Sequence, residues 1–258
     1  MVSTIQNTDV KQKDADRAVV VAVTSRAVFE SGADGDDVYG MGVAFPLLQA
    51  LQRVNERLLE ENPAESLLFD VVLITTDSQQ QQQSSRIISS TRHYGLEVSR
   101  FCFSSEEDFV ESLQKNNVQL FLSTDRNEVP QASQKGVLSA LLDRQEAPSE
   151  QLRVMFCGDA VNRPDAGPMP ASRQAAQSFS AQLGEMRQRF GMSDSPLSIV
   201  LMTSHGGRES CGGALRTLRS RGVNVDEAYC LAGAPLSPIL SVVRPHFLLS
   251  DGFSGLED

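Results

Sequence analysis

The sequence has no tryptophan, only four cysteines, and no apolar run near the roughly 18 to 20 residues that a membrane-spanning helix requires. Cys102, Cys157, Cys211 and Cys230 form no CxxC pair and are too sparse for a secreted disulfide scaffold, so we expect reduced thiols. The polar residues 1–16 contain no apolar segment of the kind that a signal peptide requires. These absences predict a cytoplasmic protein with no membrane partner.

Positive charge is also scarce in this chain. Its 258 residues include 23 Lys and Arg against 33 Asp and Glu, which gives a formal charge of -10. Because nucleic-acid phosphates are bound mainly by Lys and Arg, this balance argues against a nucleic-acid partner, although it allows a local basic pocket. With 40% hydrophobic residues, the chain can build one large or two small cored domains and is not a disordered chain.

Apolar runs alternate with helical patterns, and this order predicts an α/β fold. Runs typical of strands buried on both faces occupy 19–23, 69–74, 98–103, 118–122, 152–156 and 197–202. Apolar residues at helical spacing predict helices over 44–59, 84–93 and 174–190. Residues 1–17 are polar, and we expect them to form a flexible tail.

The second half of the chain repeats the first at an offset of about 127 or 128 residues. The pairs of similar segments are 73–76 with 201–204, 94–98 with 221–225, 101–103 with 229–231, and 120–123 with 247–250. We therefore predict two related α/β halves, 18–145 and 146–258. Their sheets should be parallel, with ligand sites beyond the carboxyl ends of the strands.

Polar segments follow the predicted strands of the second half and should meet at one edge of its sheet. They occupy 156–159, 203–207, 232–236 and 250–252. Asp159 after one strand, Thr203 at the next and Asp251 at a later one match the framework of a haloacid dehalogenase-like phosphohydrolase. There, such residues supply acid-base chemistry, a phosphate-binding hydroxyl and a carboxylate for Mg²⁺. Asp and Thr are also common turn and cap residues, and this structural interpretation stays open.

Several longer segments are specific enough to indicate a family. They are Val-Thr-Ser-Arg-Ala-Val-Phe at 23–29, Gly-Asp-Ala-Val at 158–161, Ala-Leu-Arg-Thr-Leu-Arg-Ser at 214–220 and Leu-Ala-Gly-Ala-Pro at 231–235. With shorter matches elsewhere, they resemble the cytosolic type I 5'-nucleotidases, the IA and IB group, over nearly the whole chain. The resemblance implies a haloacid dehalogenase-like parallel sheet core. It also implies Mg²⁺-dependent removal of phosphate from nucleoside 5'-monophosphates such as AMP.

The chain departs from this family where the chemistry is most demanding. Cys157 stands at the position of the nucleophilic Asp, whereas the acid-base Asp is kept as Asp159. Leu236 replaces the phosphate-binding Lys, and Ser250 replaces one of two adjacent carboxylates. The resemblance leaves Asp159 and Asp251 as the expected Mg²⁺ ligands. Because loss of a covalent nucleophile costs on the order of 10⁴ to 10⁶ in turnover, we predict impaired or lost activity, as in a pseudoenzyme.

Thr203, Ser204, His205 and Arg208 are the expected substrate-binding residues. Thr203 is the threonine of the family's second motif, and His205 stands where the family has an Arg. Arg208 follows two glycines and precedes a predicted helix whose N-terminal amides could hold an anion. A plain loop and helix cap explains this pattern equally well.

Other interpretations of these residues stay open. Cys157 and Arg163 have the C-x5-R spacing of cysteine phosphatases, but Asp159 would place negative charge inside that anion-binding loop. A single Cys at a strand end is more often an inert small hydrophobe. His93 and His246 show no metal-ligand spacing. Two functions therefore stay open. The chain is an impaired enzyme that binds nucleotide, or it is a regulatory or interaction subunit that binds nucleotide or no ligand. In either case it could form a homo- or hetero-oligomer.

Overall fold

The computed structural model describes residues 3–30, 37–76, 82, 84–142, 147–161 and 171–250. The strands of the first half are β1 (Ser3–Gln6), β2 (Val19–Thr24), β3 (Phe29–Glu30), β4 (Gly40–Met41), β5 (Phe69–Thr75), β6 (Arg100–Phe103), β7 (Leu120–Ser123) and β8 (Ser139–Leu141). Its helices are α1 (Ser25–Val28), α2 (Phe45–Glu61), α4 (Ser84–His93), α5 (Phe109–Lys115) and α6 (Glu128–Gln134).

The second half contains four strands and four helices within its described residues. The strands are β9 (Leu152–Cys157), β10 (Leu197–Thr203), β11 (Glu227–Cys230) and β12 (Phe247–Leu249). The helices are α7 (Gly158–Val161), α8 (Ala171–Gln188), α9 (Arg208–Ser220) and α10 (Ser237–Val243). The predicted alternation of strands and helices is confirmed.

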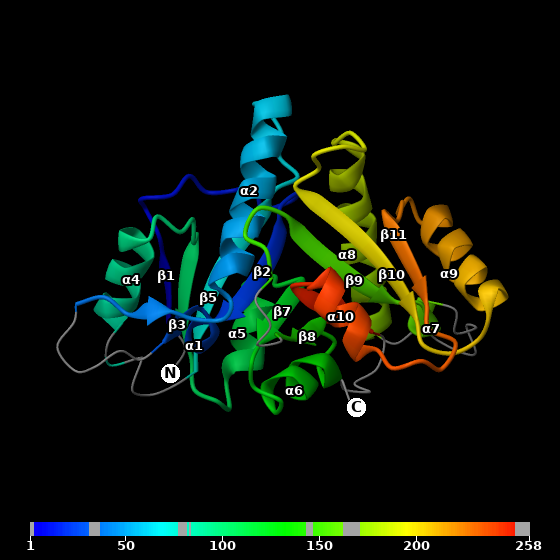
Figure 1. Ribbon diagram of the computed structural model, residues 1–258. Helices are drawn as coiled ribbons and strands as arrows, with labels where there is room; N and C mark the ends of the chain where they lie inside the picture. The colour runs from blue at the N-terminus through cyan, green and yellow to red at the C-terminus, as the bar shows by residue number, and fades with distance from the viewer. Residues whose placement is uncertain are drawn as a thin grey trace.

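Four strands of the first sheet, β6-β5-β2-β7, have the same order as the four strands of the second. The first sheet has the order β1-β6-β5-β2-β7-β8 and the second has β11-β10-β9-β12 (Figure 1). Every pairing within these sheets is parallel except that of β1 with β6. β5 and β10 begin at Phe69 and Leu197, an interval that matches the repeat in the sequence. The boundary that we predict between the halves, at residues 145 and 146, lies outside the described residues.

The prediction of a flexible tail over residues 1–17 is wrong for its first part. Residues Ser3–Gln6 form β1, which pairs antiparallel with β6 and puts Ser3 opposite Phe103. Further along, Asn7 Nδ2 donates a hydrogen bond of 2.8 Å to the Val98 carbonyl. All four residues of β1 are exposed because the strand lies at the sheet edge. Its sequence therefore shows no apolar pattern by which it could be predicted.

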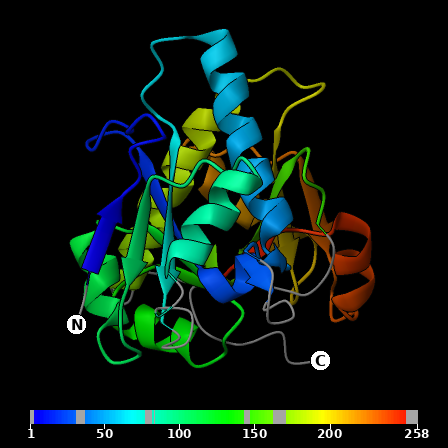
Figure 2. The ribbon, with the colours of Figure 1, turned by 90° about the vertical axis from the view of Figure 1, so that its left-hand side faces the viewer.

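Helices cover both faces of each sheet, as the view turned by 90° also shows (Figure 2). In the first half, α2 packs on the face that carries Val19, Val21 and Val23, whereas α5 and α6 pack on the face of Val20 and Ala22. In the second half, α8 and α9 pack on one face and α10 on the other. This alternation explains why β2 is an uninterrupted apolar run.

The two sheets meet where β8 lies beside β12. Their apolar side chains join in one core cluster that runs from Val21 in β2 to Val154 in β9 and includes Phe179 of α8. The halves therefore share a core. None of the helices in the described residues combines the length and the apolar character needed to cross a bilayer.

His246 lies at the amino end of β12, at the opposite edge of the sheet from the predicted site. It is 4% exposed, its Nδ1 accepts a hydrogen bond from the Arg153 backbone N–H at 3.0 Å, and its Nε2 lies 2.8 Å from the Pro148 carbonyl. Burial lowers the pKa of His246 from 6.5 to about 4. This histidine is therefore a structural residue that is neutral in the folded protein.

This burial predicts a pH-dependent stability. Between pH 6.5 and about 4 the unfolded chain protonates this histidine whereas the folded protein does not, so acidification should lower the free energy of unfolding by up to about 3 kcal/mol. Urea unfolding at several pH values should show a shallower pH dependence for His246→Gln than for the original chain. The exposed His93 provides the control, since His93→Gln should leave the dependence unchanged. Parallel curves for all three proteins would contradict this assignment.

Candidate functional site

The carboxyl ends of β9, β10 and β12 meet at one edge of the second sheet, as predicted. Cys157 lies opposite Met202 in the pairing of β9 with β10, next to Thr203. Ser250 directly follows Leu249, which pairs with Phe156 of β9. The fold therefore brings together three of the predicted positions. The backbone of Asp159 lies in α7, but its side chain, Asp251 and Arg163 lie outside what the structure describes.

Thr203 is completely buried at the end of β10. Its hydroxyl lies 3.5 Å from the Tyr229 carbonyl, a long and weak hydrogen bond. Gly158 packs against its methyl group, and a Cβ at Gly158 would lie 2.4 Å from Thr203 Cγ2 and 3.2 Å from Ala214 Cβ. The turn from β9 into α7 therefore requires a glycine at this position, directly before Asp159.

Ser204, His205 and Arg208 lie at the rim of this edge. Ser204 is half-buried and its Oγ lies 3.4 Å from Met202 Sδ, whereas His205 and Arg208 are exposed. Gly206 has a φ of +80°, the left-handed conformation that glycine adopts readily. This turn leads from the buried Thr203 to the exposed His205 and Arg208, so the four expected substrate-binding residues differ in exposure.

Two side chains from different strand ends, Cys157 and Leu236, pack against one apolar cluster. This cluster includes Met155, Met202 and Leu240. Leu236 is the N-cap of α10 and is half-buried in that contact. The α10 side of this sheet edge is therefore apolar.

Two further thiols flank Thr203. Cys211, in the first turn of α9, is buried, and Cys230 at the end of β11 is exposed and lies opposite Thr203 in the strand pairing. Burial raises the pKa of the Cys211 thiol, and its hydrogen bond with Cys230 raises that pKa further. The free cysteines agree with the predicted reduced state.

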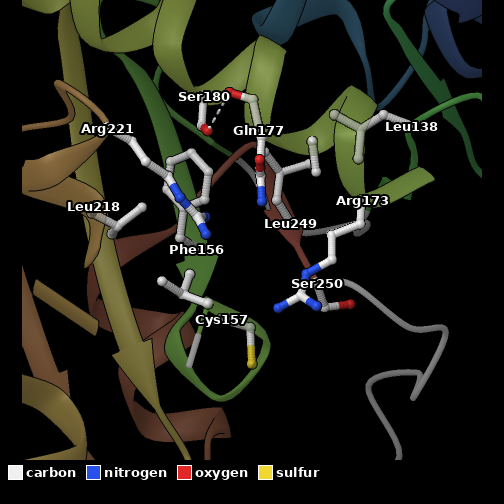
Figure 3. Close-up of a pocket in the computed structure, with 12 residues that line it drawn as sticks. Leu138, Phe156, Cys157, Arg173, Gln177, Ser180, Leu218, Arg221, Leu249 and Ser250 are labelled. Atoms are coloured by element: carbon white, nitrogen blue, oxygen red, sulfur yellow. Dashed lines mark hydrogen bonds between the residues drawn. The ribbon is translucent and has the colours of Figure 1, made fainter. Parts of the chain in front are cut away.

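A small cavity of about 30 Å³ lies behind the tip of β9 (Figure 3). Its lining includes Cys157 and Ser250 from the strand ends, Arg173 and Gln177 from α8, and Arg221 after α9. The Arg173 guanidinium points toward Ser250 in this view. A volume of this size has room for about two water molecules.

The arginines and the glutamine of this cavity were not predicted from the sequence. Arg173, Gln177 and Ser180 lie four and three residues apart, which places them on one face of a helix. This spacing is the signal that could have indicated a polar helix face beside the strand ends. No comparable sequence pattern marks Arg221.

Two larger grooves, of about 700 and 740 Å³, lie at the other edge of the sheets. Their lining comes from segments that precede strands, including 59–68 before β5 and 148–151 before β9. Ligand sites of open α/β sheets lie beyond the carboxyl ends of the strands. Of the three, the small cavity therefore has the position expected of a ligand site.

The corresponding edge of the first sheet carries a closed polar network. The buried Glu128 carboxylate accepts hydrogen bonds from Thr76 Oγ1 at 2.8 Å and Ser123 Oγ at 2.5 Å, and it pairs with the Arg26 guanidinium. Arg26 also donates to Thr76 Oγ1 at 2.9 Å and lies 3.4 Å from Asp125 Oδ2. These groups satisfy one another, so we assign no ligand to this edge.

The described donors at the second edge do not fit Mg²⁺. Sulfur is a poor ligand for this hard cation, and Cys157 supplies a thiol where the resemblance implies an oxygen ligand. Within the part of the chain that the structure describes, no group of three His, Cys, Asp or Glu side chains is placed to hold a metal ion. We therefore derive no step through a metal.

Comparisons with known proteins identify a family. The family model for 5'-nucleotidase matches residues 32–167 and 165–258. Human cytosolic 5'-nucleotidase 1B is 31% identical over 288 aligned residues, which cover 93% of this chain and 47% of that protein. This chain thus spans about half the length of that relative.

Similarity to solved structures is weak. A short chain dehydrogenase from Salmonella enterica serovar Typhi has a TM-score of 0.27 at 9% identity, covering 85% of this chain and 98% of that one. A citronellol catabolism dehydrogenase from Pseudomonas aeruginosa has a TM-score of 0.21 at 12% identity, covering 86% and 95%. Neither similarity supports an argument about fold or function.

The tight contact at Gly158 predicts a measurable loss of stability in one variant. Gly158→Ala should lower the free energy of unfolding by about 1 to 3 kcal/mol, because the new methyl group would overlap Thr203 and Ala214. Gly191→Ala is the matched control, since a Cβ there meets nothing within 4 Å. Denaturant unfolding measures both. Equal stability of the two variants would show that the turn does not constrain Thr203.

Proposed function

The chain belongs to the 5'-nucleotidase family, and from this premise we propose that it binds nucleoside 5'-monophosphates such as AMP at the carboxyl edge of its second sheet. We further propose that it hydrolyses them weakly or not at all. The fold we assign to it is a haloacid dehalogenase-like core, and its location is the cytoplasm. The substrate class comes from the family, and the position of the site comes from the convergence of Cys157, Thr203 and Ser250.

One observation supports the loss of turnover above the others. Cys157 and Leu236, at the positions of the family nucleophile and phosphate-binding lysine, pack against the same apolar cluster. A carboxylate and an ammonium group stabilise phosphoryl transfer through charge, which neither replacement supplies. Cys157 and Leu236 therefore leave the strand ends beside this cluster without the carboxylate and the ammonium group.

The remaining residues have the following proposed roles. The resemblance to the family implies that Asp159 is the acid-base group and that Asp159 and Asp251 are the carboxylates that would hold Mg²⁺. Thr203 and Ser204 bind phosphate, and His205 and Arg208 contact the substrate from the rim. The buried Thr203 hydroxyl must turn away from the Tyr229 carbonyl, 3.5 Å away, and from the Cys211 thiol for this role.

A second candidate is a regulatory or interaction subunit that is not catalytic and that forms homo- or hetero-oligomers. The same apolar replacement at Cys157 and Leu236 favours it, because packing of these side chains maintains the fold without maintaining charge. This candidate differs from the first if no nucleotide binds. Calorimetric titration with AMP separates the two, since a nucleotide-binding protein gives saturable heat and a scaffold does not.

We expect phosphate release from AMP, dAMP or pyrimidine monophosphates with Mg²⁺ to fall on the order of 10⁴-fold or more below that of an active relative, because the covalent nucleophile is absent. A colorimetric phosphate assay measures this release. Asp159→Asn is the control for contaminating phosphatases. Turnover near one per second that Asp159→Asn abolishes would contradict the loss of activity.

Restoring the charged set should restore chemistry. The triple variant Cys157→Asp, Leu236→Lys, Ser250→Asp should gain phosphatase activity over the original chain by at least about 100-fold, since it rebuilds the nucleophile and the cation. The same assay measures it, with Leu236→Lys alone as the control for a charge effect without a nucleophile. Failure of a folded triple variant that still binds AMP would show that the catalytic geometry is also lost.

A further inference from the structure

The cavity behind β9 has a cationic lining in a strongly acidic chain. Two guanidinium groups, of Arg173 and Arg221, line it, and none of its described lining residues is acidic. The remaining polar groups are the Gln177 amide, the Ser180 and Ser250 hydroxyls and the Cys157 thiol. In Figure 3 both guanidinium groups extend inward, Arg221 from the α9 side and Arg173 from the α8 side.

The second half of this chain offers only arginines as cations for a phosphate. The last lysine of the sequence is Lys135, and every cationic side chain after it other than histidine is an arginine. Leu236, at the position of the family lysine, packs into the apolar cluster on the α10 face of the sheet. The arginines of the cavity approach from the side of α8 and α9.

Arg221 differs in its partners from Arg187 and Arg189. Arg187 pairs with Asp226 at 2.6 Å and Arg189 pairs with Glu185 at 3.5 Å. Among the described residues, no carboxylate lies within 4.0 Å of the Arg221 guanidinium, although the residue is half-buried. A guanidinium that is directed into a cavity without a counter-charge favours an anion there.

We propose that Arg173 and Arg221 form an oxyanion site that takes the phosphate group of a monoester or free phosphate, in place of the missing lysine. The inference rests on the proposed function for the identity of the monoester. Guanidinium groups donate paired hydrogen bonds to phosphate oxygens, so two of them replace one ammonium group with a more directional site. The phosphate sits at the mouth of the cavity because five heavy atoms exceed the space of about two waters.

The alternative role for these arginines is structural. Arg221 and Phe156 line the same cavity, and a guanidinium placed over an aromatic ring stabilises a fold through a cation–π contact. In that case, loss of Arg221 would lower the melting temperature and would leave phosphate binding unchanged. Binding and stability are therefore measured on the same proteins.

Titration of the full chain with inorganic phosphate, followed by calorimetry, tests the site. We expect Arg173→Gln and Arg221→Gln each to weaken phosphate binding at least tenfold. Arg219→Gln is the matched control, because it removes the same charge from the exposed face of α9 outside the cavity. Arg173→Lys and Arg221→Lys should retain part of the affinity, and thermal unfolding shows whether each variant is folded.

The outcomes separate this inference from the proposed function. Absence of phosphate binding by the original chain, or equal binding by the folded Gln variants and Arg219→Gln, overturns the arginine site. Phosphate binding that depends on both arginines, without binding of AMP, supports the arginine site and refutes the nucleotide. AMP binding that neither arginine affects supports the proposed function and overturns this inference. If a Gln variant does not fold, the Lys variant at the same position is measured in its place. A phosphate affinity of that Lys variant equal to the affinity of Arg219→Gln also overturns the inference.

Discussion

The position of β9 between β10 and β12 determines everything that we infer about the site. Because both neighbours run parallel to it, their carboxyl ends lie at the same edge, and Cys157, Thr203 and Ser250 become neighbours although they are distant in sequence. Buried side chains on both faces of β9 hold this arrangement, Val154 toward α8 and Met155 toward α10. Backbone hydrogen bonds and apolar packing set this geometry, so it does not depend on which side chains occupy the strand ends.

The two faces of this strand tip have diverged in character. On the α10 face, Cys157 and Leu236 extend an apolar cluster. On the α8 and α9 side, Arg173 and Arg221 line the cavity. The α10 face of the strand tip is thus apolar, whereas the side of α8 and α9 carries positive charge. The anion site that we propose lies on the charged side.

The strands that are buried on both faces could be predicted from the sequence. The apolar runs gave β2, β5, β9 and β10, and the repeat gave the shared strand order, because burial on both faces constrains composition strongly. The sequence did not indicate β1, whose four residues are exposed at the edge, or β8, which has only three residues. The short helices α5 and α6 were also missed, since seven residues show less than two helical turns of pattern.

The site was predictable only in part for a similar reason. The strand ends were visible as polar segments after apolar runs, whereas the cavity arginines come from a helix face and from a residue after a helix, and their proximity depends on packing. Burial of the Thr203 hydroxyl could not be foreseen, since it depends on the contact of Gly158 with the neighbouring strand.

The Glu128 network in the first half and the Arg221 guanidinium in the second differ in how their charges are balanced. The Glu128 carboxylate acts as a built-in counter-ion for Arg26, so the charge at that edge is balanced by the polypeptide itself. The Arg221 guanidinium has no such internal partner among the described residues. By thermodynamic linkage, an anion that binds only the native chain would raise its free energy of unfolding, and because the two halves share a core this stabilisation would extend from the second half to the first.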